Sequence, residues 1–497
     1  MEFILYISGK INPLQSVVVL AAAILISSFF GFTKKKVFKK FIIAVGSISL
    51  FLAFCLNIYV FISMGAFSDS LLTFGIMQVI EAGIIIFAAL NLLFFISAYE
   101  LNSNHFVKIL ILLLFSTICA VFIVISENFI LMFTSLTIFI LTIFQLVTSL
   151  NSSVSKTGSY TLRYFLRPAL TVILFLFGFS LFYGASDFKN LGQILVSENI
   201  SNPLTVLGLI IFGVAVYLYF FLFPFQNPYL GLMKRARSSS NSVIWFLYFP
   251  AGFFMFLKFS ELYSFYIEKS SLYTSVIFII VTFICMFAAN LGAVKTGSIR
   301  RIMSFLFLYF IGVFLLNISM FSTGIISKSS MEWLNIAGIF LLVFSFIPIY
   351  SVFSRIERDT GSDSIAGIRG FGRSNIYISV NLLIIFLSWS VIALYIIPFG
   401  KYFNGMVFSE MGAANMMLLA VIAVVFLFLM VNVFRIISVF YRKPAGGAAE
   451  KIIFPKYFYI YITFFTLAIL IITVWCLMEI SCIETGFMDF KITEFSF

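Results

Sequence analysis

Residues 34–63 read KKKVFKKFIIAVGSISLFLAFCLNIYVFIS, five lysines followed by an apolar run of 23 residues. An α-helix needs about 20 apolar residues to cross a bilayer, so the run at 41–63 predicts a transmembrane helix. The gap that follows, residues 64–77, contains no lysine or arginine. Basic residues stay on the cytoplasmic side of a membrane, so the change from a basic to a non-basic gap predicts the direction of this helix.

The composition of the whole chain extends this prediction. Hydrophobic residues make up 62% of the 497 residues and charged residues only 10%, whereas a soluble domain has about 25% charged residues. The sequence therefore predicts an all-α polytopic membrane protein with about fourteen transmembrane helices. The expected spans are 13–32, 41–63, 78–98, 108–125, 129–149, 164–184, 204–222, 242–262, 272–293, 302–322, 333–353, 376–399, 414–440 and 457–478.

Basic residues occur in alternate gaps between these spans. If successive spans alternate in direction, 24 of the 31 Lys and Arg residues lie on one side of the membrane. This side is the cytoplasmic one or its equivalent, which leaves both termini facing outward. The net charge of +12 is thus a topology signal, and we expect no nucleic-acid partner, because the charges do not cluster on one soluble face.

The chain lacks the usual signatures of covalent or metal chemistry. It has no Gly-rich phosphate loop followed by lysine, and its one histidine, His105, has no candidate ligand partners nearby. The five cysteines show no metal-ligand spacing. We therefore predict no catalytic residue, no metal and no cofactor in this chain, and assign it to transport.

Three charged side chains within or beside the spans are candidates for a transport pathway, because ionisable groups inside a membrane are costly and usually functional. They are Glu81, Lys258 and Lys401. The alternative for the lysines is that each extends to the outer interface, and Lys258 also has Glu261 nearby. Both interpretations stay open from the sequence.

Proline and glycine interrupt two spans that lie five apart. Pro224 falls in the seventh, and Pro398 and Gly400 fall in the twelfth, just before Lys401. Such broken helices line the pathway in transporters built from inverted repeats. We predict a single membrane domain over residues 1–497. It contains N-terminal helices 1–3 (1–106), a first five-helix repeat from spans 4–8 (107–262), a second from spans 9–13 (271–440), and a C-terminal helix with its tail (441–497).

Several motifs occur in an order and spacing that resemble a known family. They are Arg163-Tyr-Phe-Leu, FGFSLFYGAS at 177–186, the stretch from Leu207-Gly208-Leu209 to Phe223-Pro224-Phe225, AVKTGSIRRIMS at 293–304, and Phe399-Gly400-Lys401. The chain resembles the antiporter-like membrane subunits of respiratory complex I, most closely subunit N of the NADH:quinone oxidoreductase. The resemblance covers roughly residues 70–445.

Most of the family's buried charged residues are replaced in this chain. The resemblance places the family's fifth-helix glutamate on Thr137, its seventh-helix lysine on Tyr219, its eighth-helix lysine on Phe249 and its tenth-helix histidine on Phe310. Only Lys401 keeps its charge. Thr137 and Tyr219 can hold hydrogen bonds, but a tyrosine hydroxyl ordinarily has a pKa of about 10, so neither titrates usefully at neutral pH.

The resemblance implies a non-redox membrane-arm subunit of a proton-translocating NADH:quinone oxidoreductase, with this copy's own proton path reduced or structural only. It implies proton-path candidates Lys401, Thr137, Tyr219, Lys258 and Glu81. NADH, FMN, iron–sulfur clusters and quinone are expected in partner subunits, and the expected partners are the antiporter-like subunit M, the small subunits K, J and A, and lipids. The expected location is a bacterial inner membrane, or alternatively the mitochondrial one. A membrane hydrogenase, a multi-subunit cation/proton antiporter or a stand-alone secondary transporter remain alternatives.

Overall fold

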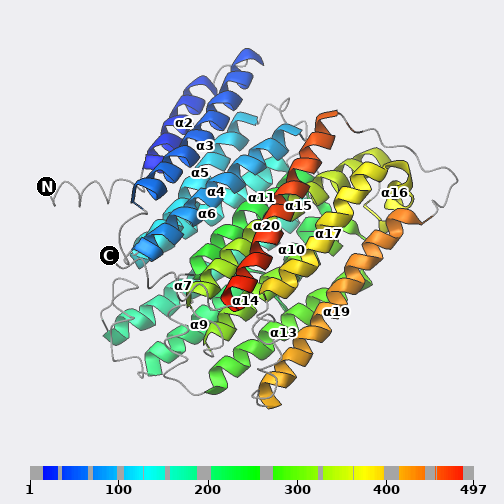
Figure 1. Cartoon of the computed structure of the whole chain (residues 1–497). Helices are drawn as coiled ribbons and strands as arrows, with labels where there is room; N and C mark the ends of the chain where they lie inside the picture. Colours follow the sequence, from blue (N-terminus) through cyan, green and yellow to red (C-terminus); the bar gives the residue numbers. More distant parts are fainter. Residues whose placement is uncertain are drawn as a thin grey trace. The chain divides into compact units, whose positions relative to one another are not determined.

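The computed structural model describes most of the chain as helices (Figure 1). The described residues are 15–31, 36–64, 71–97, 106–126, 128–151, 157–186, 203–257, 272–322, 328–361, 363–396, 413–442, 454 and 456–484. Within these ranges there is no strand, and an isolated bridge joins Ser298 and Ser364. The prediction of an all-α fold is confirmed.

The chain forms two compact units, which are described separately. The first consists of Met1–Phe221 and Phe225–Lys269, and the second of Leu222–Pro224 and Ser270–Phe497. The helices of the first unit are α2 (Gln15–Gly31), α3 (Lys36–Met64), α4 (Leu71–Ser97), α5 (Phe106–Ile125), α6 (Phe129–Leu150), α7 (Thr157–Ser186), α9 (Pro203–Tyr219), α10 (Asn227–Arg235), α11 (Ser238–Val243) and the π-helical turn η4 (Ile244–Tyr248).

The second unit contains longer helices and two short helical turns. Its elements are α13 (Leu272–Lys295), α14 (Ile299–Ser322), α15 (Lys328–Thr360), the 3-10 turn η5 (Ile365–Ile368), α16 (Phe371–Ser374), α17 (Ile376–Ile396), α19 (Ala413–Tyr441) and α20 (Lys456–Glu484). Within this unit α13 packs along α14, and α17 packs along α20.

Some of these helices are long enough to span a membrane. Among the described residues, eight helices are long and apolar enough to cross a bilayer, or nine if the bent pair Ile365–Ser374 and Ile376–Trp389 is one span. Each of the fourteen predicted spans overlaps a described helix, and five of these helices have shorter apolar segments. The chain is a multi-pass membrane protein, and the number of fourteen crossings stays a prediction.

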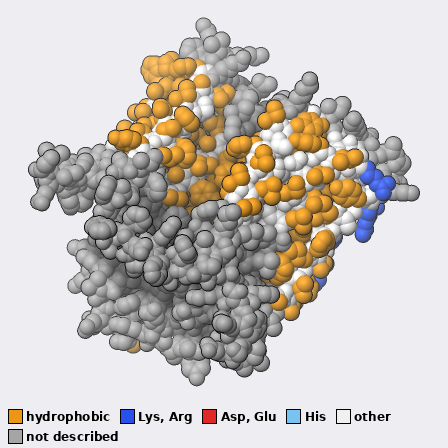
Figure 2. Space-filling model, viewed as in Figure 1, with side chains coloured by type: hydrophobic (Ala, Val, Ile, Leu, Met, Phe, Trp, Pro, Cys, Tyr) orange, Lys and Arg blue, Asp and Glu red, His pale blue; other side chains and the backbone are white. Residues whose placement is uncertain are grey.

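Apolar side chains cover much of the described surface. Figure 2 shows hydrophobic side chains over much of the described part of the visible face, with Lys and Arg side chains at one edge of it. Hydroxyl groups inside the helices are turned back onto backbone carbonyls, as in Ser116 to Leu113 and Thr117 to Leu114. This arrangement suits a bilayer, because no water is available there to pair an exposed polar group.

The predicted interruption of the seventh span is present. Helix α9 ends at Tyr219, and α10 starts at Asn227 after a turn that contains the cis Phe223–Pro224 peptide bond. In the twelfth span, α17 ends at Ile396. Pro398, Gly400 and Lys401 lie outside the described residues, and so does Lys258 of the eighth span.

The eighth span differs from its predicted bounds. We expected it to begin at residue 242, but the helical segment runs from Ser238 to Leu257 and is buried throughout. The polar residues Ser239, Ser240 and Asn241 are therefore inside the unit. The reason is that helices α6 and α10 provide their hydrogen-bond partners, which an apolar-run criterion cannot detect.

Candidate functional site

A pair of tyrosines occupies the break in the seventh span. Tyr219 is the last residue of α9, and Tyr248 is the last residue of the turn η4. Each hydroxyl donates a hydrogen bond to the backbone carbonyl of the other residue, at 2.9 Å from Tyr219 and 3.1 Å from Tyr248. Their rings stack with centroids 4.4 Å apart and planes inclined by 8°. Both side chains are fully buried, so the pair joins the two elements through a water-excluded contact.

A π-helical turn ends at Tyr248. In η4 the N–H of Phe249 bonds to the carbonyl of Ile244, five residues back, instead of four. The carbonyl of Tyr248, the last residue of this turn, accepts the hydrogen bond of the Tyr219 hydroxyl. Gly252, one turn further on, provides the space for the ring, because a Cβ there would lie 1.8 Å from Tyr219 Cε1.

Five more aromatic side chains surround the pair. We call Tyr164, Tyr219, Phe220, Phe221, Tyr229, Tyr248 and Phe249 the aromatic block. Phe221 has a backbone φ of +52°, which is unfavourable for a residue with a Cβ, and its ring stacks on Tyr164 at 4.8 Å and on Tyr229 at 5.6 Å. All seven residues are buried and none carries a charge. At Tyr219 and Phe249, the two positions where the resemblance places lysines, the block therefore has neutral rings.

Thr137 does not face the aromatic block. Its neighbour Phe139 stacks on Tyr248, with ring centroids 6.3 Å apart. Two residues on an α-helix are separated by roughly 200° around the axis, so Thr137 lies on the other side of α6. It is partly buried, and its hydroxyl donates to the carbonyl of Phe133 at 2.7 Å. The structure thus does not bring Thr137 together with Tyr219.

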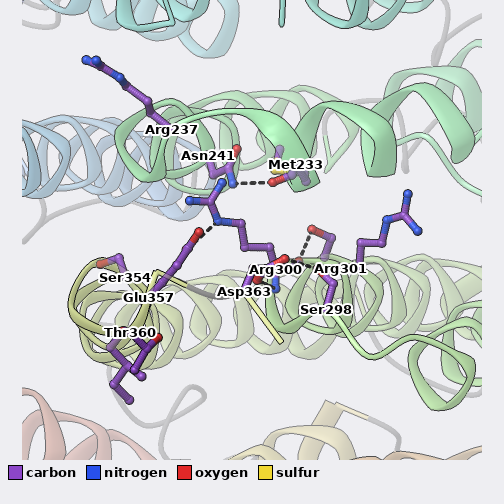
Figure 3. Close-up of polar contacts among 12 residues, drawn as sticks. Met233, Arg237, Asn241, Ser298, Arg300, Arg301, Ser354, Glu357, Thr360 and Asp363 are labelled. Carbon is purple, nitrogen blue, oxygen red and sulfur yellow. Dashed lines mark hydrogen bonds and ion pairs between the residues drawn. The ribbon is translucent and has the colours of Figure 1, made fainter. Parts of the chain in front are cut away.

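Buried polar residues lie at the start of the eighth span, where we predicted none. Asn151 at the end of α6 donates from Nδ2 to Ser240 Oγ at 2.8 Å, and its Oδ1 accepts the backbone N–H of Arg237 at 2.8 Å. Asn241 Nδ2 donates to the carbonyl of Met233 at 3.0 Å (Figure 3). The signal in the sequence was the run Ser-Ser-Ser-Asn-Ser at 238–242, directly after the basic residues of α10.

Glu81 lies in a different part of the first unit. It is buried on α4, accepts a hydrogen bond from Ser16 Oγ on α2, and is also hydrogen-bonded to the side chain of Asn57 on α3. Ser16 and Asn57 were not predicted, because their link to Glu81 spans helices that are distant in sequence.

The second unit also has an aromatic side chain where the family histidine was placed. Phe310 on α14 is buried, 5.5 Å from Trp389 and 6.5 Å from Phe346 between ring centroids. The indole N–H of Trp389 donates to Ser345 Oγ at 2.8 Å. This position too has neutral packing in place of a titratable group.

Charged residues cluster at the start of α14 (Figure 3). Arg300 Nε lies 2.8 Å from Glu357 Oε2 on α15. The Asp363 carboxylate accepts the backbone N–H of Arg300 at 3.1 Å and the hydroxyl of Ser298, and its carbonyl accepts the N–H of Ile299 at 2.9 Å. Asp363 therefore caps the first turn of α14 from a distant part of the chain.

Arg435 on α19 caps the other end of the preceding helix. Its guanidinium donates to the carbonyls of Ala293 at 3.1 Å, Val294 at 2.6 Å and Thr296 at 3.1 Å, around the last residue of α13. These carbonyls have no partner inside the helix, and the positive charge meets the negative end of the helix dipole. In the described parts of both units, no group of three or more His, Cys, Asp or Glu residues could hold a metal ion.

No family model matches the chain. Curated relatives are named NADH-quinone oxidoreductase subunit N 2 of Acidobacterium capsulatum, 24% identical over 298 residues, and subunit N 1 of Koribacter versatilis, 24% identical over 382 residues. The first alignment covers 58% of each protein, and the second covers 75% of this chain and 73% of the relative. The chain thus spans less than two thirds of the first relative's length.

Solved structures show the same fold at low sequence identity. A chain of respiratory complex I from Thermus thermophilus aligns with a TM-score of 0.71 and 17% identity, covering 94% of this chain and 99% of that one. A chain of the archaeal membrane-bound sulfane sulfur reductase gives 0.71 and 16%, covering 96% and 98%. A chain of the Mrp complex from Dietzia gives 0.69 and 14%, covering 89% and 82%. The resemblance predicted from the motifs is confirmed by these relatives.

Proposed function

We propose that this chain is a subunit N-like component of the membrane arm of a complex I-type NADH:quinone oxidoreductase, and that its first repeat does not conduct protons. The relatives named subunit N and the fold support the first statement. The observation that carries the second is the reciprocal Tyr219–Tyr248 pair inside the aromatic block.

Proton movement through a membrane protein needs titratable side chains or a continuous chain of hydrogen-bonded water. In the aromatic block the two central hydroxyl protons are each committed to a backbone carbonyl. The surrounding rings are packed at 4.4 to 6.4 Å between centroids, which leaves the hydroxyls no mobile partner in the described structure. The block therefore acts as neutral packing that stabilises the broken seventh helix.

Lys401 would be the remaining charged group of a reduced path in the second repeat, and Glu81 lies outside both repeats. Lys258 and Thr137 belong to the first repeat and would carry protons only if that repeat is not silent. The partners would be the antiporter-like subunit M, the small subunits K, J and A, and lipids. NADH, FMN, iron–sulfur clusters and quinone would all be held by other subunits. The membrane would be a bacterial inner membrane, with the mitochondrial inner membrane as the alternative. The alternation of basic gaps favours an orientation with both termini outside.

The test is proton translocation per electron pair in sealed vesicles that contain the assembled complex. We expect Tyr219→Phe to leave this ratio unchanged, because the hydroxyl is taken to carry no protons. The control is removal of the corresponding lysine in the antiporter-like subunit M of the same complex, which should lower the ratio. A lower ratio for Tyr219→Phe at normal assembly would contradict a silent first repeat. Lys401→Ala then decides whether the second repeat conducts.

A second assembly is favoured by one observation, the nearly equal structural similarity to the sulfane sulfur reductase and Mrp chains. In that case the chain belongs to a membrane hydrogenase-like complex or a cation/proton antiporter. Purification of the native complex distinguishes the two. NADH-oxidising subunits in the purified complex support the main proposal, and their absence with hydrogen-oxidising or antiporter subunits present supports the alternative. A chain that purifies alone would indicate a stand-alone transporter.

A further inference from the structure

Glu81 is a buried acid that forms no ion pair with any described residue. It lies in the first half of α4 with 1% of its surface exposed. Among the described residues no lysine or arginine forms an ion pair with it, whereas Glu357 and Asp359 in the second unit are each paired with an arginine. A permanently charged carboxylate in such a place is costly, because desolvation favours the neutral form.

The charged groups on the neighbouring helices do not supply a partner. Helix α2 has no titratable residue, and Glu81 is the only one on α4. The helices that pack against these two are α3, α5, α11 and η4. Their titratable or charged residues are Lys36, Lys39, Lys40, Cys55 and Tyr59 on α3, Lys108 and Cys119 on α5, and Tyr248 on η4.

The hydrogen-bond partners of Glu81 suit both of its protonation states. As a carboxylate, Glu81 accepts from Ser16 Oγ and from the Asn57 side chain, and Ser16 is in the first turn of α2, where the helix dipole favours negative charge. Asn57 Oδ1 is buried and has no hydrogen-bond partner. Only a donor can satisfy this oxygen, and a neutral carboxyl group next to it has one to give.

We propose that Glu81, Ser16 and Asn57 form a proton-binding site in helices α2, α3 and α4, separate from the aromatic block. In the neutral state the Glu81 hydroxyl donates to Asn57 Oδ1 while the Asn57 amide donates to the other carboxyl oxygen, a paired double hydrogen bond. On deprotonation the proton leaves to solvent, and the Ser16 hydroxyl and the Asn57 amide hold the carboxylate. In this deprotonated state Asn57 Oδ1 has no hydrogen-bond partner, which is the arrangement that the structure shows.

The position of the site indicates from which side the proton comes. Ser16 is near the start of α2, and Asn57 is near the end of α3. Both are thus far from the ends of α2 and α3 that flank the connection between these helices, and Ser16 is about 20 Å from Gly31 along α2 at 1.5 Å per residue. If that connection is cytoplasmic, the site exchanges protons with the outer side. Only this use of the proton in coupling rests on the proposed function; the binding of the proton does not.

The test is labelling of the intact complex in native membranes with dicyclohexylcarbodiimide, an apolar reagent that modifies protonated carboxyl groups. Mass spectrometry then gives the modified fraction of Glu81 from about pH 5 to about pH 9. We expect labelling that falls as the pH rises and that is absent in Glu81→Gln. Glu357 is the internal comparison, because its carboxylate, unlike that of Glu81, forms an ion pair with Arg300.

Ser16→Ala separates proton binding from a structural tether. It removes a donor to the carboxylate only, so the labelling midpoint should move up by about one to two pH units. Infrared spectroscopy of the same membranes provides a second readout, a carboxyl C=O band that is lost in Glu81→Gln. The proposed site is overturned if neither the label nor the carboxyl band is found at any pH. It is also overturned if Ser16→Ala leaves the pH midpoint of labelling unchanged.

These experiments use the resting complex without NADH. A result for or against the Glu81 site is therefore independent of whether the chain couples electron transfer to proton translocation. If Glu81 titrates but the chain purifies without NADH-oxidising subunits, the proposed function fails and the site stands.

Discussion

Gly252 determines whether the Tyr219 ring can lie in its place. The ring atoms Cε1, Cζ and Oη would lie 1.8, 2.4 and 2.7 Å from a Cβ at this position. Because Tyr219 is held at its hydroxyl end by the Tyr248 carbonyl and along its face by the Tyr248 ring, it cannot turn away without losing both contacts. A single methyl group would therefore displace the centre of the aromatic block.

The first prediction concerns this glycine. Gly252→Ala should destabilise the protein by about 3 kcal/mol or more, the upper part of the range for overpacked cores. The measurement is the thermal unfolding midpoint of the purified protein in detergent, together with its amount in the membrane. Tyr219→Ala in the same chain should recover part of the loss by providing room.

Gly158 is the matched control for that substitution. It is an exposed helical glycine with nothing within 4 Å of a built Cβ, so Gly158→Ala should be neutral or slightly stabilising. Equal effects of the two substitutions would show that the close approach of Tyr219 to Gly252 does not limit stability.

At the scale of single elements, the two helices α13 and α14 are both capped by residues from far along the chain. Arg435 holds the last carbonyls of α13, and Asp363 holds the first amides of α14. The connection between the two helices is short, so both caps act on the same corner of the second unit. Helix α14 also has a local cap, because Ser298 Oγ accepts the backbone N–H of Arg301 at 3.4 Å.

The second prediction is that Asp363→Ala weakens the first turn of α14. Loss of a capping carboxylate costs about 0.5–2 kcal/mol, and the Ser298 hydroxyl also loses its partner. Hydrogen exchange at the amides of the first turn of α14 should become faster. Asp363→Asn keeps an acceptor oxygen and should retain most of the protection; if the two variants exchange alike, Asp363 does not act as a cap.

The third prediction is that Arg435→Lys destabilises the end of α13. A lysine ammonium is a point charge and cannot reproduce the three contacts of the planar guanidinium. The loss of one or two hydrogen bonds should lower the free energy of unfolding by about 1–3 kcal/mol. Exchange of the last amides of α13 reports this directly. Arg442→Lys, at an exposed position next to the end of α19, serves as the control and should change nothing.

These elements also show what the sequence can predict. Each apolar run of about 20 residues became a helix because an unpaired backbone is too costly in a bilayer, and Pro224 predicted the break between α9 and α10. The start of the eighth span was missed because Ser239, Ser240 and Asn241 are buried only through partners on other elements. The reciprocal bonds of Tyr219 and Tyr248 join residues 29 apart, and no local sequence pattern indicates them.

At the scale of the whole molecule, the exposed apolar side chains require a lipid or protein environment. Large hydrophobic residues that are more than half exposed occur on helices of both units, for example Phe51, Ile173, Phe434 and Ile460. A monomeric soluble protein rarely exposes such continuous apolar surface. The described surfaces of each unit therefore face lipid or neighbouring subunits.

The fourth prediction tests the direction in which the chain crosses the membrane. In a variant without native cysteines, Lys443→Cys should react with a membrane-impermeant maleimide only after the membrane is permeabilised. Lys491→Cys should react in intact cells, because the alternation of basic gaps places the C-terminus outside. The reverse result would invert the topology, and equal reactivity on both sides would contradict a fixed orientation.

The capping of α14 by Asp363 has a consequence for how the protein is made. Asp363 is 63 residues beyond Arg300, so the ribosome must add all of α14 and α15 before the cap exists. At 5–20 residues per second this takes about 3 to 13 seconds. During that interval α14 enters the membrane without the Asp363 cap, and only the local Ser298 hydroxyl, which accepts the Arg301 N–H, is present. A nascent chain stopped before residue 363 would therefore expose this corner to proteases or chaperones, until Asp363 is made and leaves the ribosome.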